Sequence, residues 1–113
     1  TIIGRSDIVG KPLAKLMTNK DATVTLCHSK SKLSNHIYDS DLIVCAVGQA
    51  GFLNCYPIHC PVVDVGINFV DGKLVGDCYN TDGRNVTPVP GGVGLLTRLT
   101  LLENVVKAKE MYG

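Results

Sequence analysis

Two apolar runs, each stopped by a glycine, constrain the fold more than any other feature of this sequence. The first is Asp41–Val47, in which every residue after Asp41 is apolar and which ends at Gly48. The second is Pro61–Val65, which is interrupted only by Asp64 and ends at Gly66. A strand that is apolar at every position is buried on both faces, as strands of a parallel sheet are. The sequence therefore predicts an α/β fold.

Short strands and helices alternate through the first half of the chain. We expect strands over Thr1–Gly4 and Ala22–Cys27, and helices over about Lys11–Asn19 and Leu33–Tyr38. Pro12 suits the first turn of a helix, where its missing N–H is not needed. This alternation predicts a Rossmann-like, doubly wound, mostly parallel sheet with helices on both faces.

The second half of the chain has a different pattern. The Asp-Gly pair at positions 71 and 72 lies between two apolar stretches and predicts a hairpin over Ile67–Gly76. A polar loop over Asn80–Asn85 and a last short strand over Val86–Val89 follow. We expect a glycine-rich loop over Pro90–Gly94 and then a long amphipathic helix over Leu95–Met111. One side of that helix carries Leu95, Leu99, Leu102 and Val106.

Composition narrows the possible partners and the compartment. The 113 residues suit one domain, and the formal net charge of +1 gives no basis for binding nucleic acid or an anionic membrane. No apolar run approaches the ~20 residues of a membrane span. The five cysteines include no CxxC pair, so we expect free thiols in a reducing compartment, the cytoplasm, with an organelle left open. The chain opens inside a strand without a signal peptide, so we expect it to be part of a longer protein.

The expected strands end at Gly4, Cys27, Gly48 and Gly66, which should lie along one edge of the sheet. Ligands of open α/β sheets bind in the crevice outside the carboxyl ends of the strands. The polar loops that follow these strands should therefore gather in one cleft.

The first of these loops resembles a dinucleotide fingerprint with serine in place of the second glycine. It reads Gly4-x-Ser6-x-x-Val9-Gly10 between a strand and a helix. Gly4 permits a tight turn, and a helix N-terminus offers N–H groups and a positive dipole end to phosphate. The hydroxyl of Ser6 would add a donor. The alternative is a plain strand-to-helix turn in which Ser6 caps the helix.

The turn after the second strand indicates which dinucleotide would bind. An NAD site usually has Asp or Glu there for the ribose 2′-hydroxyl, whereas a 2′-phosphate attracts cations and hydroxyls. Here the strand runs into His28, Ser29 and Lys30 with no acid, and Arg5 can reach the same place from the first loop. The sequence therefore favours NADP, with NAD possible. The alternative is a solvated basic turn.

The later loops carry glycines but no obvious chemistry. Gly48 and the Gly66-Ile67-Asn68 segment would let the backbone approach the ribose and nicotinamide, although tight turns explain each glycine equally well. The proline and glycine loop at 88–94 would pack against a flat ligand ring or a neighbouring domain. Cys55, His59 and Cys60 come from one loop without a fourth ligand, so we predict no metal site. No catalytic residue is predicted either.

Two long motifs resemble the bifunctional methylenetetrahydrofolate dehydrogenase/methenyltetrahydrofolate cyclohydrolases. Gly4–Pro12 (GRSDIVGKP) is similar to the family's GRSxxVGxP motif. Thr87–Gly94 (TPVPGGVG), followed by Thr97, is similar to its TPVPGGVGPxT signature. Asp64–Asn68 and Val75–Asp77 fall between them in the family's order, and the resemblance spans nearly the whole chain.

The resemblance implies that residues 1–113 are the NAD(P)-binding Rossmann domain of a two-domain enzyme and that the folate-binding catalytic domain is absent. It implies contacts of Arg5, Ser6 and Ser29 with the NADP phosphates and places Gly48, Ile67 and Asn68 near the ribose and nicotinamide. The cofactor-binding residues expected from motif and resemblance together are Gly4, Arg5, Ser6, Val9, Gly10, His28, Ser29, Gly48, Gly66, Ile67, Asn68, Gly94 and Thr97. The loop expected on the substrate side is Pro90, Gly91 and Gly92.

For the whole enzyme the resemblance implies oxidation of 5,10-methylenetetrahydrofolate to the methenyl form with NADP, and hydrolysis to 10-formyltetrahydrofolate. The tetrahydrofolate derivative would be held jointly with the absent domain, the protein would be a homodimer, and the isolated domain would be inactive. Two departures are Leu95, where the family has proline, and a stretch from Cys27 to Asp41 that is one residue short. The alternatives are a non-catalytic nucleotide-binding or dimerisation module, and the cofactor domain of another two-domain dehydrogenase such as a shikimate-type enzyme.

Overall fold

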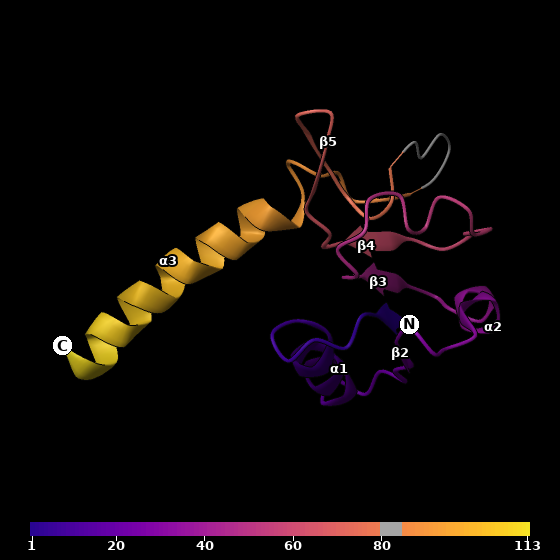
Figure 1. Cartoon of the computed structure of the whole chain (residues 1–113). Helices are drawn as coiled ribbons and strands as arrows, with labels where there is room; N and C mark the ends of the chain where they lie inside the picture. The colour runs from indigo at the N-terminus through magenta and orange to yellow at the C-terminus, as the bar shows by residue number, and fades with distance from the viewer. Residues whose placement is uncertain (80–84) are drawn as a thin grey trace.

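The computed structural model describes residues 1–79 and 85–113 and contains a four-stranded parallel sheet (Figure 1). Its strands are short and lie in the order β2-β1-β3-β4. They are β1 (Ile2–Ile3), β2 (Leu26–Cys27), β3 (Ile43–Cys45) and β4 (Val62–Asp64). These four strands were predicted, but each is shorter than predicted, and in β2 only the last two residues of the predicted strand pair. The α/β, mostly parallel fold is confirmed.

Two short helices connect the first three strands. Helix α1 (Gly10–Thr18) joins β1 to β2, and α2 (Leu33–Tyr38) joins β2 to β3. These two connections run in opposite directions across the sheet. Because such crossovers are right-handed, α1 and α2 belong to opposite faces. The predicted bounds are right for α2, and α1 begins one residue earlier than predicted.

The main core lies on the α2 side of the sheet. In register, Ile3 lies beside Cys27 and Cys45, and these side chains pack with Leu33 and Ile37 of α2. All three residues of β3 are buried, as the continuous apolar run predicts. Cys27 and Cys45 are buried as expected, and all five cysteines are free thiols.

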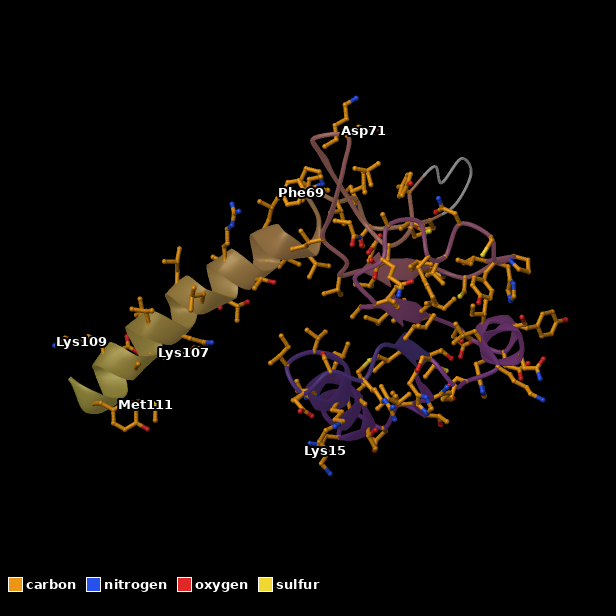
Figure 2. All side chains as sticks on the ribbon, viewed as in Figure 1. Lys15, Phe69, Asp71, Lys107, Lys109 and Met111 are labelled. Atoms are coloured by element: carbon orange, nitrogen blue, oxygen red, sulfur yellow. The ribbon has the colours of Figure 1, made fainter. Side chains whose placement is uncertain are left out.

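The hairpin forms as predicted and is a separate two-stranded sheet. It consists of β5 (Asn68–Val70) and β6 (Lys73–Val75), paired antiparallel with Asp71 at the tip (Figure 2). The strand predicted over Val86–Val89 is wrong, because Val86 makes only a single parallel bridge to Val62. The peptide bond between Val89 and Pro90 is cis. The loop predicted over Asn80–Asn85 lies almost wholly outside the described residues.

Helix α3 (Val93–Tyr112) extends away from the sheet with no other element alongside (Figure 1). It begins two residues before the predicted start and contains no buried residue. Leu99 and Leu102, on the predicted apolar side, are more than half exposed, but so are Leu96 and Leu101 outside it. The prediction of a single apolar side is therefore wrong, because apolar residues occur around the helix. A helix of this kind is normally covered by other structure.

Candidate functional site

A cavity of about 530 Å³ lies at the carboxyl ends of β1, β2 and β3. It brings together five of the residues predicted to bind a cofactor. These are Gly4, Arg5, Ser6, His28 and Ser29. A second cavity, of about 500 Å³, lies at the opposite ends of the strands and is lined by none of the predicted residues. The strand-end rule therefore selects the first cavity as the candidate site.

The loop after β1 folds tightly against its neighbours. Gly4 has φ of +116°, and a Cβ there would overlap the carbonyl oxygen of Ala46 at the end of β3. A Cβ on Gly10 would overlap the carbonyl oxygen of Gly4. The start of α1 thus lies directly on the loop, a contact that only glycine at both positions allows. Val9 and Gly10 contact residues of this loop and do not line the cavity.

Ser6 caps α1 in this structure. Its Oγ accepts hydrogen bonds from the backbone N–H of Val9 (3.1 Å) and Gly10 (3.5 Å), and its carbonyl accepts one from Lys11 (3.1 Å). The expectation of free N–H groups at the helix start is therefore wrong, because Ser6 occupies them. The backbone N–H groups of residues 5–8 have no acceptor among the described residues. They are the donors that a phosphate could reach, together with the hydroxyl hydrogen of Ser6.

The turn after β2 is closed by its own hydrogen bonds. The backbone N–H of His28 donates to Ser31 Oγ (2.9 Å), and that of Lys30 donates to His28 Nδ1 (3.2 Å). Ser29 and Lys30 are left exposed, as is Arg5 across the cavity. No carboxylate is among the described residues that line the cavity. This wall of the cavity therefore favours an anionic group.

An apolar wall closes the other side of the cavity and was not predicted. Leu33, Phe52 and Tyr56 line it, and the two aromatic rings lie 6.1 Å apart with a tilt of 36°. The sequence has few aromatic residues, and two of them meet here. Nothing in the local sequence marks Phe52 and Tyr56, because they reach the cavity only through the path of the loop after β3. Gln49 completes the lining on this side.

The remaining predicted residues lie outside this cavity. Gly48 follows β3, Gly66 and Ile67 follow β4, and Asn68 is the first residue of β5 in the hairpin. Five more lie in the loop before α3 or in its first turns. They are Pro90, Gly91, Gly92, Gly94 and Thr97. Thr97 Oγ1 donates to the carbonyl of Val93 (3.1 Å), and Gly94 is already helical.

Two buried aspartates, Asp64 and Asp77, join these strand ends to the hairpin. Oδ1 of Asp64 accepts hydrogen bonds from the N–H of Gly66 (2.9 Å) and Asp77 (3.1 Å), and Oδ2 accepts one from Cys78 (2.8 Å). Burial raises the pKa of Asp64, although these three N–H donors oppose the shift. Sequence reasoning missed both residues as part of the site's support.

Three further findings concern metal binding, membrane insertion and thiol reactivity. No three His, Cys, Asp or Glu side chains converge as a metal site within residues 1–79 and 85–113. The helices over the same residues include none that is long and apolar enough to cross a membrane. Burial raises the pKa of Cys45 far above the usual thiol value, so this thiol is not a nucleophile at neutral pH.

A parallel sheet in the order β2-β1-β3-β4, a tight glycine loop before α1 and a cavity at the carboxyl ends of the strands define a Rossmann-type nucleotide-binding domain. The sequence profile of the family "Tetrahydrofolate dehydrogenase/cyclohydrolase, NAD(P)-binding domain" matches residues 1–112. The chain belongs to this family, which decides against a shikimate-type dehydrogenase.

Curated relatives and solved structures agree with this assignment. The "Bifunctional protein FolD" of Thermotoga maritima is 50% identical over 97% of this chain, and that of Thermoplasma acidophilum is 46% identical over 97%. The crystal structure of the bifunctional 5,10-methylenetetrahydrofolate dehydrogenase/cyclohydrolase from Thermoplasma acidophilum superposes with a TM-score of 0.87 at 44% identity and 97% coverage. A 5,10-methylenetetrahydrofolate dehydrogenase from the silkworm, Bombyx mori, gives 0.83 at 32% identity and 97% coverage. The chain spans only 42–43% of the length of these proteins.

Proposed function

We propose that this chain binds NADP in the cavity at the carboxyl ends of β1, β2 and β3. The observation that carries the proposal is the lining itself. Arg5 and Ser29 face the cavity, and none of its described lining residues is an acid that could hold the ribose 2′-hydroxyl of NAD. An arginine and hydroxyl groups are what a 2′-phosphate attracts. NAD would bind more weakly in the same place.

The cavity suits the adenosine end of the cofactor in size and chemistry. Its volume of about 530 Å³ lies within the range of small-molecule sites. The N–H groups of residues 5–8 and the Ser6 hydroxyl would hold the diphosphate, and Phe52, Tyr56 and Leu33 would pack against the adenine. The nicotinamide end would extend toward Gly48, Gly66, Ile67 and Asn68.

We further propose that the chain is the cofactor-binding part of an enzyme of folate one-carbon metabolism. That enzyme would oxidise 5,10-methylenetetrahydrofolate to 5,10-methenyltetrahydrofolate and hydrolyse it to 10-formyltetrahydrofolate. The names of the relatives support both reactions. Bound NADP would accept the hydride. This chain would orient the cofactor and exclude water around it, while the folate-binding domain would supply the catalytic side chains. The parent protein would function in the cytoplasm.

The exposed apolar surface of α3 is an argument for a partner domain that covers this helix. Leu95, Leu99, Leu102 and Val106 are each more than half exposed, as are apolar residues on the other sides of the helix. The relatives are more than twice as long as this chain, which leaves room for a folate-binding domain that would cover α3. The tetrahydrofolate derivative would bind between that domain and the loop Pro90–Gly92.

The exposed apolar side chains of the hairpin segment are an argument for a homodimer. Ile67 and Phe69 are 66% and 77% exposed, and Phe69 belongs to the strand of the hairpin that leads to its tip at Asp71 (Figure 2). A two-stranded sheet is only marginally stable without further cover. Pairing with a second copy at this edge would supply it. Phe69→Glu should convert a dimer to a monomer, as measured by analytical ultracentrifugation, whereas Tyr38→Glu on exposed α2 should not.

The direct test is a calorimetric titration of the 113-residue chain with NADP and with NAD. We expect binding of NADP that is weak but tighter than that of NAD, and no dehydrogenase turnover. Absence of heat with both cofactors would contradict the binding proposal, and turnover would contradict the assignment of catalysis to another domain. The alternative left by the sequence, a non-catalytic nucleotide-binding module, would bind the same cofactors. A source reading frame that continues upstream into a lysine-bearing folate domain would decide for the enzyme.

A further inference from the structure

Asp77 collects four N–H donors from two segments that follow neighbouring strands. Its side chain is completely buried. Oδ2 accepts hydrogen bonds from the backbone N–H of Val47 (2.7 Å) and Gly48 (3.0 Å). Oδ1 accepts hydrogen bonds from the N–H of Gln49 (3.0 Å) and from Nδ2 of Asn68 (3.0 Å). A single carboxylate thus holds three successive amides of the loop after β3 and one side chain at the start of β5.

The three amides fix a segment that forms part of the cavity wall. Val47 and Gln49 line the cavity, and Gly48 between them has φ of +76°. Three successive N–H groups directed at one anion form the kind of concave nest that binds phosphate in other proteins. Here an internal carboxylate fills the nest. The loop is therefore closed to an external anion and held rigid at the edge of the cavity from which the nicotinamide half would extend.

Asp77 also sets the orientation of the Asn68 side chain. A carboxylate accepts but does not donate, so Asn68 must turn its NH₂ group toward Asp77. The same Nδ2 lies 3.5 Å from the carbonyl oxygen of Val75. Oδ1 of Asn68 accepts no hydrogen bond from any described residue, and the side chain is partly exposed. The side-chain amide of Asn68 therefore has a fixed orientation, in which its Oδ1 can accept a hydrogen bond from a ligand.

The surroundings keep the Asp77 carboxylate in place. Asp64 accepts a hydrogen bond from the backbone N–H of Asp77 (3.1 Å). A Cβ on Gly66 would overlap the Asp77 carboxylate, so this position has room for the carboxylate only because it is glycine. Gly66 and Asn68, both predicted near the cofactor, therefore each contact the Asp77 carboxylate.

We propose that Asp77 is a positioning residue for the nicotinamide half of NADP. It acts through Asn68, whose Oδ1 it presents to the carboxamide N–H of the nicotinamide, and through the backbone of residues 47–49. The inference rests on the proposed function. A purely structural tie is the competing explanation, and it predicts equal effects on every ligand of the domain.

The test compares two ligands on the same variant. NADP carries the nicotinamide, and adenosine 2′,5′-bisphosphate carries only the adenosine half. In Asp77→Asn the new NH₂ group replaces one of the two oxygens. In place of Oδ1 it opposes both the Gln49 N–H and the Asn68 NH₂, and in place of Oδ2 it opposes the N–H groups of Val47 and Gly48, so two of the four hydrogen bonds are lost in either orientation. We expect NADP to bind about 10-fold more weakly, the scale of one hydrogen bond involving a charged group, with adenosine 2′,5′-bisphosphate within about twofold of wild type.

Two further variants keep the test decisive. Asn68→Ala leaves the backbone amides of 47–49 bonded to Asp77 and should show the same selective loss of NADP, also where Asp77→Asn fails to fold. In the double variant the loss should be smaller than the sum of the two single losses, because Asp77 acts in part through Asn68. Ile37→Val in the core, remote from this network, destabilises the fold and should leave the ratio of the two affinities unchanged.

The outcomes separate the two proposals. Wild-type chain that binds neither ligand overturns the proposed function itself. Wild-type binding with equal losses of both ligands in the Asp77→Asn and Asn68→Ala variants, or with no loss in either, overturns the positioning role and leaves the binding site standing. The positioning role is supported if Asn68→Ala weakens the binding of NADP but not that of adenosine 2′,5′-bisphosphate. Asp77→Asn should give the same result where that variant folds.

Discussion

The carboxylate of Asp64 occupies the space that a side chain at position 76 would need. A Cβ on Gly76 would overlap the Asp64 carboxyl group, whose two oxygens accept hydrogen bonds from Gly66, Asp77 and Cys78. The end of the hairpin and the end of β4 therefore approach each other at a distance that only glycine permits. This contact seats the hairpin against the parallel sheet.

Gly76→Ala should destabilise the fold by about 1–3 kcal/mol, the usual cost of forcing an extra methyl group into a packed site. The loss should appear in urea unfolding followed by circular dichroism. Gly94→Ala is the matched control, because a Cβ there meets nothing within 4 Å and the residue lies in α3. Equal stability of Gly76→Ala and wild type would show that the carboxylate can move aside.

Ser6→Ala should weaken the start of α1. The variant loses the acceptor for the N–H groups of Val9 and Gly10, and replacement of a capping serine costs about 1 kcal/mol. Thermal unfolding is a suitable measurement. Ser29→Ala removes another cavity-lining hydroxyl that caps no helix, so its midpoint should match that of wild type. A Ser6→Ala midpoint equal to both would contradict the capping role.

Arg5→Ala should weaken binding of NADP more than binding of NAD. The two cofactors differ only in the 2′-phosphate, and loss of one hydrogen bond to a charged group corresponds to about 10–100-fold in affinity. Calorimetric titration of both cofactors gives the ratio. Lys20→Ala removes an exposed cation that does not line the cavity and should leave that ratio unchanged. A proportional loss of both cofactors in Arg5→Ala would place the guanidinium on the diphosphate instead.

Local patterns in the sequence predicted the elements that depend on neighbouring residues. The apolar run around Ile43–Cys45 predicted a strand buried on both faces, and the Asp71-Gly72 pair predicted the hairpin. The loop after β1 was also recognisable, because its glycines are needed for contacts within a few residues or with the adjacent strand. Periodicity and turn chemistry are local properties, so they can be read without the fold.

The contacts that complete the site depend on segments far apart in the chain. Asp77 accepts hydrogen bonds from amides 28–30 positions earlier, and no pattern around Asp77 marks it as their acceptor. Phe52 and Tyr56 reach the cavity because the loop after β3 folds back toward Leu33. The environment of α3 was mispredicted for the same reason, since an apolar spacing does not say whether anything covers it.

Stability should fall with rising pH in the range where Asp64 titrates. Burial raises its pKa in the folded chain above the value in the unfolded chain, about 3.9. Between these two values the folded state binds more protons than the unfolded state, so the free energy of unfolding decreases as pH rises. The decrease from this one group is at most about 1.4 kcal/mol per pH unit, and it ends above the raised pKa.

Asp64→Asn removes this titration. Relative to wild type, the variant should therefore gain stability as pH is raised from about 4, the lower bound set by the unfolded chain, toward neutrality. Urea unfolding of both proteins across this range measures the difference. Asp71→Asn, at the exposed tip of the hairpin, should run parallel to wild type. If wild type instead gained on Asp64→Asn with rising pH, the three N–H donors would outweigh burial, and the pKa of Asp64 would lie below its usual value.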